Sequence, residues 1–208
     1  MTDRYDTKGN TEGQYQPGSN RSVLLNKLAI TDVSEMNEVE LELLDQLYDK
    51  VLSTININQA ITTNDLAEWH RTWMGNVYEW AGRQRSVNMS KGDFHFAVAN
   101  QIAHLLKELD KKYLRKLTPC DQFSDTKLIE AIAVIHIEFI LVHPFREGNG
   151  RLSRLLANVM ALQAGKNELD FSYWDEQREV YFKAIQAGLA CDYEPMKALV
   201  KQVLLDSQ

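Results

Sequence analysis

Residues 143–154 hold the side chains of this chain that are best suited to phosphate chemistry. The segment reads His-Pro-Phe-Arg-Glu-Gly-Asn-Gly-Arg-Leu-Ser-Arg. Gly148 and Gly150 let the backbone turn with positive φ, so that successive N–H groups can point into one concavity that suits an anion. Because a helix is predicted to begin here, its unpaired N–H groups and its positive dipole end add to that site. The loop is therefore predicted to hold phosphate.

The same segment supplies the groups that transfer of a phosphorus group from a nucleotide requires. Such a transfer needs in-line positioning, neutralised charge on the phosphate oxygens and a base for the incoming hydroxyl. His143 is the candidate base, and Glu147 is a hard oxygen ligand suited to Mg²⁺. Arg151 and Arg154 can each offer paired donors to phosphates. Each residue type is common at helix ends for structural reasons, but a structural role does not explain the whole set in one turn.

The composition limits the classes of function that the chain can have. Its 208 residues suffice for one well-filled core. A net charge of -6 argues against a general affinity for nucleic acid or for an anionic membrane, so phosphate recognition must be local. The apolar run 128–142 is too short to span a membrane comfortably, and residues 1–6 lack the apolar stretch of a secretory signal. Because Cys120 and Cys191 match no metal or redox spacing, we expect reduced thiols in a cytoplasmic protein.

The segments around the loop predict an essentially all-α protein with one short β-hairpin. Residues 1–22 form a polar arm that is either mobile or laid across the core, and residues 23–208 form a single domain. Apolar spacing and capping residues predict helices that begin after Asp32 and at Asp65, and others over 97–114, 125–143, 152–162, 175–189 and 194–205. His70 lies on the apolar face of the helix that Asp65 caps, and we interpret it as a core histidine with satisfied hydrogen bonds.

The hairpin is predicted over residues 83–96, where the apolar period changes to two. Arg85, Val87 and Met89 alternate there with Ser86, Asn88 and Ser90 before a turn at 91–93. An isolated hairpin leaves an unpaired edge. The segment is therefore either a surface loop or a place where a partner peptide adds as a strand.

The complete segment 143–154 resembles the signature of the Fic family, H-x-F-x-[D/E]-G-N-G-R-x-x-R, at all nine defined positions. The similarity extends to Tyr78–Gly82 and Val87–Gly92, which resemble the family's helix and hairpin "flap", and to Leu25–Leu28, which resembles the leader of many bacterial members. It covers most of residues 10 to 200. It implies a helical Fic bundle with its core at about 66–190, flanking helices, and the flap over the active-site loop.

The resemblance implies adenylylation, the transfer of AMP from ATP to a side-chain hydroxyl of a target protein with release of pyrophosphate. His143 would deprotonate the target hydroxyl, Phe145 would anchor the loop in the core, and Glu147 would bind Mg²⁺ at the α and β phosphates. Arg151 would hold the β-phosphate and Arg154 the γ-phosphate.

Further contacts follow from the same resemblance. The phosphates would be held by Gly148, Asn149 and Gly150. The flap would pair with a target segment through Val87, Asn88, Met89, Ser90 and Gly92. Lys91 is predicted to reach the nucleotide and Tyr181 to lie near the adenine. One branch of the family carries Lys at the second loop glycine and transfers phosphate instead, so Gly150 favours AMP transfer.

Control of such an enzyme is expected from a glutamate that pairs with Arg154. Many Fic proteins carry this glutamate in a [S/T]-x-x-x-E-[G/N] motif, and the chain has only partial matches, of which Ser34 with Glu38 lies in the helix ahead of the core. We therefore expect either a small antitoxin that supplies the glutamate or control by another route. Two other functions stay open: a hydrolase that removes AMP from a modified protein, and a nucleotide-gated binding module with little turnover.

Overall fold

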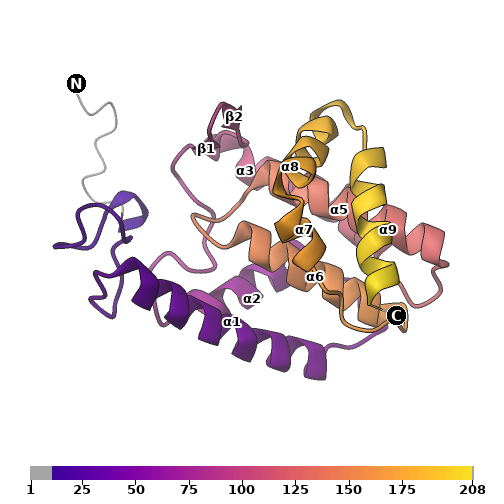
Figure 1. The fold of residues 1–208 in the computed structure, drawn as a ribbon, viewed down its shortest axis with the longest axis horizontal. Helices are drawn as coiled ribbons and strands as arrows, with labels where there is room; N and C mark the ends of the chain where they lie inside the picture. The colour runs from indigo at the N-terminus through magenta and orange to yellow at the C-terminus, as the bar shows by residue number, and fades with distance from the viewer. Residues whose placement is uncertain (1–10, 208) are drawn as a thin grey trace.

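The fold is a helical bundle built around the buried helix α5 (Figure 1). The computed structural model describes residues 11–207. Helix α5 (Asp125–Val142) packs against α6 (Asn149–Gln163) and α9 (Glu194–Asp206). It is apolar on nearly every side, as expected of a helix covered all round by its neighbours. The all-α prediction with one short hairpin is confirmed.

Helices α1 (Val33–Thr54) and α2 (Thr63–Met74) pack on each other and both contact α6 (Figure 1). Asp32 is the N-cap of α1, as predicted, because its carboxylate accepts from the Glu35 N–H at 2.9 Å. Asp65 does not cap α2. Thr62 is the N-cap, and the Asp65 carboxylate reaches back to the Thr62 N–H at 2.8 Å to complete a capping box.

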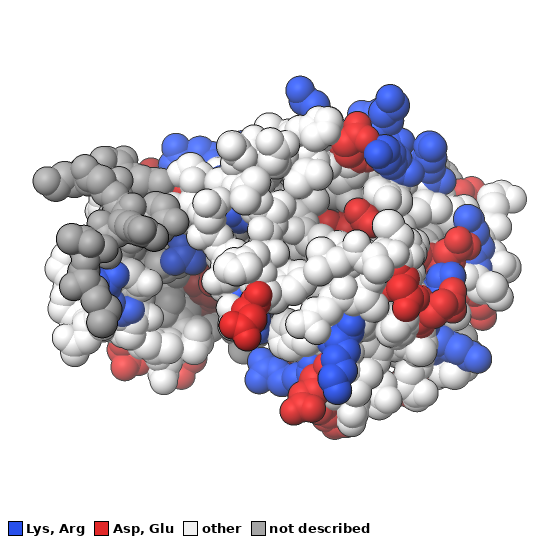
Figure 2. Space-filling view, turned by 90° about the horizontal axis from the view of Figure 1, so that it is seen from above, with Lys and Arg blue, Asp and Glu red and all other residues white. Residues whose placement is uncertain are grey.

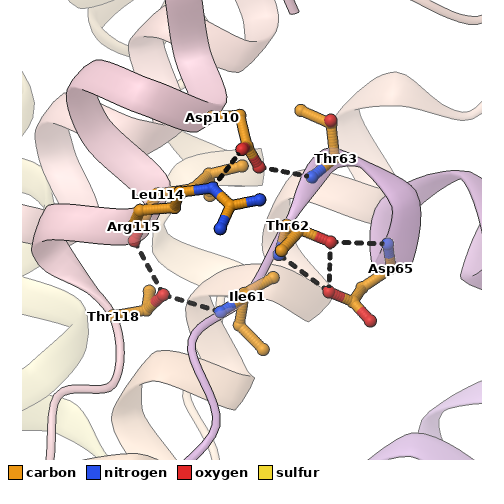
Figure 3. A network of polar contacts seen from close by, with 8 residues as sticks. All are labelled: Ile61, Thr62, Thr63, Asp65, Asp110, Leu114, Arg115 and Thr118. Carbon is orange, nitrogen blue, oxygen red and sulfur yellow. Dashed lines mark hydrogen bonds and ion pairs between the residues drawn. The ribbon is translucent and has the colours of Figure 1, made fainter. Parts of the chain in front are cut away.

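The start of α2 is also fastened to the segment that follows α3 (Ile102–Leu109), as Figure 3 shows. The Asp110 carboxylate accepts from the Thr63 N–H at 3.2 Å. The Thr118 hydroxyl accepts from the Ile61 N–H at 2.8 Å and donates to the Leu114 carbonyl at 2.7 Å. These bonds satisfy backbone groups at two helix ends at once.

The helix predicted over 97–114 is not uniform. It begins as a 3₁₀ turn (Ala99–Gln101), continues as α3, widens into a π-helical turn (Asp110–Leu114) and ends as α4 (Arg115–Leu117). The helix predicted over 175–189 is divided into α7 (Ser172–Glu176) and α8 (Arg178–Ala187). The division falls at Gln177, whose φ of -98° and ψ of 41° are not helical.

The hairpin is shorter than predicted. Strands β1 (Ser90–Lys91) and β2 (Phe94–His95) are antiparallel, with Ser90 opposite His95 and a positive φ of 58° at Gly92 in the turn. The alternation from Arg85 to Met89 does not form a strand, because the Arg85 N–H donates to the Pro144 carbonyl and the Ser86 N–H donates to the Glu12 carboxylate instead of to a neighbouring strand.

The described part of the amino-terminal arm lies on the domain. A 3₁₀ turn (Thr11–Gly13) precedes an isolated bridge between Tyr15 and Leu24. The Glu12 carboxylate is buried and accepts from the Ser86 N–H at 2.6 Å, and Arg146 Nε donates to the Glu12 carbonyl at 2.9 Å. The rest of the predicted arm, residues 1–10, lies outside the described residues.

Acidic and basic side chains are interspersed in small groups on the face seen in Figure 2. Broad uncharged surface separates them. This face therefore does not present a single basic field of the kind that binds nucleic acid nonspecifically. Among the helices of residues 11–207, none is long and apolar enough to cross a membrane.

Candidate active site

The predicted phosphate loop connects α5 to α6 and opens into a cavity of about 750 Å³. Residues of α5, the loop, α6, the hairpin region, α7 and α8 line it: Met89, Ser90, Lys91, Gly92, Phe94, Phe96, Ile140, His143, Glu147, Gly148, Asn149, Gly150, Arg151, Arg154, Trp174, Asp175, Arg178, Tyr181, Phe182, Ile185 and Gln186. A cavity of this size is typical of a small-molecule site. The structure thus brings most of the predicted site residues together.

His143 ends α5 in a left-handed conformation, with φ of 49°. Its ring stacks on Phe96 at 3.7 Å between centroids, and its Nδ1 lies 3.2 Å from the Ile140 carbonyl. Because a carbonyl can only accept, Nδ1 carries the proton and the lone pair is on Nε2. Burial lowers the pKa of His143 to about 4, so the imidazole is neutral at pH 7 and able to take a proton.

Asn149 and Phe145 fix the shape of the loop. The Asn149 side chain accepts from the Phe145 N–H at 2.9 Å and donates to the Phe145 carbonyl at 2.8 Å, which closes the turn. Phe145 is 2% exposed and stacks on His70 at 4.1 Å between ring centroids. The predicted anchor therefore sits in the core, and the Asn149 side chain holds the loop from within.

His70 is the core histidine that the sequence predicts. Its Nδ1 accepts from the Gly82 N–H at 2.8 Å, so its Nε2 carries the proton and donates to the Glu147 carbonyl at 3.1 Å. Burial lowers the pKa of His70 to about 4. His70 thus joins the predicted phosphate loop to α2. Its position on an apolar face of the helix does not reveal this role.

The two loop glycines serve different purposes. Gly148 has φ of 81°, and a Cβ at this position would lie 2.6 Å from Trp73, so only glycine fits there. The positive φ predicted for Gly150 is wrong, because Gly150 lies inside α6. A Cβ on Gly150 would have nothing within 4 Å, so open space lies beside the N-terminus of α6, where an anion is favoured.

Arg151 and Glu147 lie together at the loop. Arg151 Nη2 is 2.8 Å from a Glu40 carboxylate oxygen of α1 and 3.6 Å from Glu147 Oε1. Glu40 is buried and accepts from the Tyr78 hydroxyl at 2.7 Å. Glu40 was not predicted as part of the site, because its only signal in the sequence is a charged residue among the apolar positions of α1.

Arg154 is held by a carboxylate from α7. Its two Nη atoms donate to the two Asp175 oxygens at 2.9 and 2.7 Å. The hydrogen bond from Arg154 is the main cause that lowers the pKa of Asp175. Glu38, the partial match in the sequence, is exposed on α1. Asp175 therefore pairs with Arg154, the arginine for which the sequence predicted a glutamate partner.

Lys91 and Tyr181, both predicted to contact the nucleotide, lie on the cavity wall, and their contact with a nucleotide stays a prediction. Lys91 Nζ lies 3.9 Å from the centroid of the Phe182 ring, and desolvation lowers its pKa. The Tyr181 hydroxyl is 2.8 Å from Nε2 of the buried His136, and burial raises the pKa of Tyr181. The surrounding aromatic wall, including Trp174, was missed because its members are far apart in the sequence.

The flap residues divide into two groups. Met89, Ser90 and Gly92 line the cavity. Val87 and Asn88 instead form the root of the flap, where the Val87 carbonyl accepts from Arg85 at 2.6 Å and Asn88 Oδ1 accepts from the Ala99 N–H at 2.9 Å. These two residues support the hairpin and do not face the cavity.

Comparison with known proteins gives one consistent result. Residues 60–161 match the family described as "Fic/DOC family". A Sinorhizobium fredii protein named "Probable protein adenylyltransferase y4lH" is 28% identical over 192 residues, which cover 90% of this chain and 93% of that protein. A Nematostella vectensis protein named "Protein adenylyltransferase Fic" is 27% identical over 186 residues, and the match covers 84% of this chain but only 40% of that protein.

The fold also matches solved structures. The crystal structure of BepC from Bartonella tribocorum with bound AMPPNP has a TM-score of 0.74 and 23% identity, with 92% of this chain and 96% of that chain covered. The arrangement of helices around the loop is therefore shared with that protein.

Proposed function

Because residues 60–161 place the chain in the Fic/DOC family, we propose that it is a protein adenylyltransferase, which moves AMP from ATP to a hydroxyl side chain of a target protein. One observation carries this proposal. A neutral imidazole, His143, borders the same cavity as a helix N-terminus and two arginines, Arg151 and Arg154. A base for a hydroxyl and donors for several phosphates are the groups that nucleotidyl transfer needs.

The reaction would proceed by in-line displacement at the α-phosphate. Nε2 of His143 accepts the proton of the target hydroxyl as its oxygen attacks phosphorus. The bond from the α-phosphorus to the bridging oxygen breaks, and pyrophosphate leaves. The N–H groups at the start of α6 stabilise the charge on the phosphate oxygens, and Arg151 and Arg154 hold the departing phosphates.

A Mg²⁺ ion fits this site through Glu147. The Glu147 carboxylate lines the cavity, and among the described residues no cluster of three or more His, Cys, Asp or Glu side chains forms a metal cage. A single protein carboxylate suits Mg²⁺, which takes its other ligands from substrate phosphates and water. When bound, the ion would neutralise charge on the α and β phosphates.

The target protein would lie along the hairpin. Ser90 and Gly92 border the same cavity as His143, and the two-stranded sheet has free edges among the described residues. A target segment that adds as a strand would bring its hydroxyl to the base through backbone hydrogen bonds. We place this reaction in the cytoplasm, where ATP is available.

In this proposal the activity is regulated through the access of ATP to Arg154. The γ-phosphate of ATP and the Asp175 carboxylate compete for the same guanidinium, so ATP must displace Asp175. A small antitoxin that supplies a glutamate would act at the same guanidinium from outside the chain. Asp175 gives the chain a carboxylate of its own for this purpose.

The proposal is tested by following which phosphate of ATP is transferred to protein. The protein is incubated with Mg²⁺, a cell lysate, and ATP labelled at either the α or the γ phosphate. We expect the α label on a protein and the γ label in released pyrophosphate. Transfer of the γ label to protein above the level seen in the lysate alone would show a kinase instead. Labelling by a His143→Ala variant at the wild-type rate would exclude His143 as the base.

A further inference from the structure

Arg85 is a buried cation whose hydrogen bonds go to backbone carbonyls. The side chain is 2% exposed. Its Nε donates to the His143 carbonyl at 2.7 Å, and its Nη2 lies 3.4 Å from the Val142 carbonyl. Its Nη1 donates to the Val87 carbonyl at 2.6 Å, and its Nη2 also donates to the Ala97 carbonyl at 2.6 Å. Charge-assisted bonds of this length are among the stronger hydrogen bonds in proteins.

These acceptors come from three parts of the site. Val87 precedes the hairpin and Ala97 follows it, so one guanidinium joins both ends of the flap. Val142 is the last residue of α5, and His143, which follows it, carries the imidazole proposed as the base. Backbone bonds run in parallel, from the Arg85 N–H to the Pro144 carbonyl at 2.8 Å and from the Ala97 N–H to the Leu141 carbonyl at 3.1 Å.

The end of α5 needs such a partner for two physical reasons. The last carbonyls of a helix have no partner within the helix, and its C-terminus carries partial negative charge, which a cation stabilises. His143 also has φ of 49°, a conformation that a non-glycine residue keeps only when its surroundings hold it. Arg85 supplies both the charge and the fixed geometry.

We propose that Arg85 is a positioning residue that holds the catalytic His143 and the two ends of the flap as one rigid unit. The proposal rests on the adenylyltransferase function, in which the flap carries the target segment and His143 takes its proton. The distance between base and hydroxyl is then set by Arg85, which touches neither the nucleotide cavity nor the target. The predicted contacts to the phosphates of ATP come mainly from other residues, those of α6 and its loop.

Lysine cannot replace Arg85 in this role. A guanidinium is planar and spreads five N–H donors over a fixed fork, whereas an ammonium offers three donors from one point. An Arg85→Lys variant therefore keeps the positive charge but cannot span the flap ends and α5 together. Arg83 provides the matched control, because it lies two residues away on the same segment and is exposed.

The first test separates positioning from nucleotide binding. Labelling of a lysate is measured against ATP concentration for the wild type, Arg85→Lys and Arg83→Lys. Since a misplacement of about 1 Å can cost on the order of 100-fold in rate, we expect the maximal rate of Arg85→Lys to fall by this factor. The KM for ATP should stay within about twofold by the same geometric argument. A wild-type rate in Arg85→Lys, or an equal loss from Arg83→Lys, would overturn the proposal.

A second test does not depend on activity and so distinguishes a wrong role for Arg85 from a wrong function. In nuclear magnetic resonance spectra of the wild type, the Arg85 Nε–H should exchange slowly with water and show coupling across the hydrogen bond to the His143 carbonyl. The exposed Arg83 Nε–H should exchange fast. If the two exchange alike, Arg85 does not hold His143, whether or not the protein labels a target. This measurement also decides the matter if Arg85→Lys fails to fold.

Discussion

Mild acid should destabilise the fold, because three histidines are buried in their neutral form. Burial lowers the pKa of His70 to about 4, of His136 to about 3 and of His143 to about 4. In the unfolded chain each histidine titrates near 6.5. Below pH 6.5 the histidines of the unfolded chain take up protons, whereas those of the folded chain stay neutral. Because the unfolded chain binds more protons, the free energy of unfolding falls as the pH falls from 6.5 toward 4.

The size of this effect follows from the three pKa values. Between pH 7 and pH 5 each histidine lowers the free energy of unfolding by about 2 kcal/mol, and the three together lower it by roughly 5 to 6 kcal/mol. That is comparable to the whole stability of many domains, about 5 to 15 kcal/mol. Carboxylates with a lowered pKa, such as Asp175, reduce the free energy of unfolding only at lower pH. The histidines therefore dominate the change between pH 7 and pH 5.

Urea denaturation at pH 7, 6 and 5 measures the effect. A His136→Phe variant cannot bind a proton at this position. Its free energy of unfolding should therefore fall less between pH 7 and pH 5 than that of the wild type, by about 2 kcal/mol. His104→Gln, a change at an exposed histidine, should keep the full loss. A change in the free energy of unfolding below about 1 kcal/mol between pH 7 and 5 would show that these histidines are not held neutral.

Three further predictions concern the loop and its arginines. Arg154→Ala should weaken binding of ATP by about tenfold more than binding of ADP, since a hydrogen bond to a charged group contributes about 1.5 to 3 kcal/mol; calorimetric titration checks this, and an equal loss for both nucleotides argues against a γ-phosphate contact. Asp175→Asn should raise ATP affinity by about two- to fivefold, because the exposed carboxylate it removes competes through a pair worth up to about 1 kcal/mol; weaker ATP binding would mean that Asp175 does not compete. Gly148→Ala should lower the free energy of unfolding by about 2 to 4 kcal/mol, from positive φ and the contact with Trp73; a urea midpoint equal to that of the wild type would contradict this geometry.

Local patterns in the sequence predict most of the helices and the phosphate loop. Apolar spacing gives α1, α2, α5, α6 and α9, because each buries one face or all of its surface against neighbours. The loop is predictable because its glycines, its base and its arginines are contiguous. The roles of these residues toward ATP and a target remain predictions.

The site residues that the sequence does not predict are those whose partners lie in distant segments of the chain. Arg85 resembles an alternating strand residue, and only the packed structure shows its acceptors at the ends of α5 and the flap. Glu40 and Asp175 belong to helices that meet α6 only in the fold, so nothing near them in sequence indicates an arginine partner. The break at Gln177 likewise has no local proline or glycine to announce it.

The central claim is that His143 activates a protein hydroxyl for attack on the α-phosphate of ATP. Mass spectrometry of a protein labelled by the wild-type enzyme tests it most directly. We predict AMP on a serine, threonine or tyrosine oxygen, and no such adduct when His143→Ala replaces the wild type at equal concentration and equal ATP binding. Adduct formation by the variant at the wild-type rate, or phosphate in place of AMP on the hydroxyl, would contradict the account.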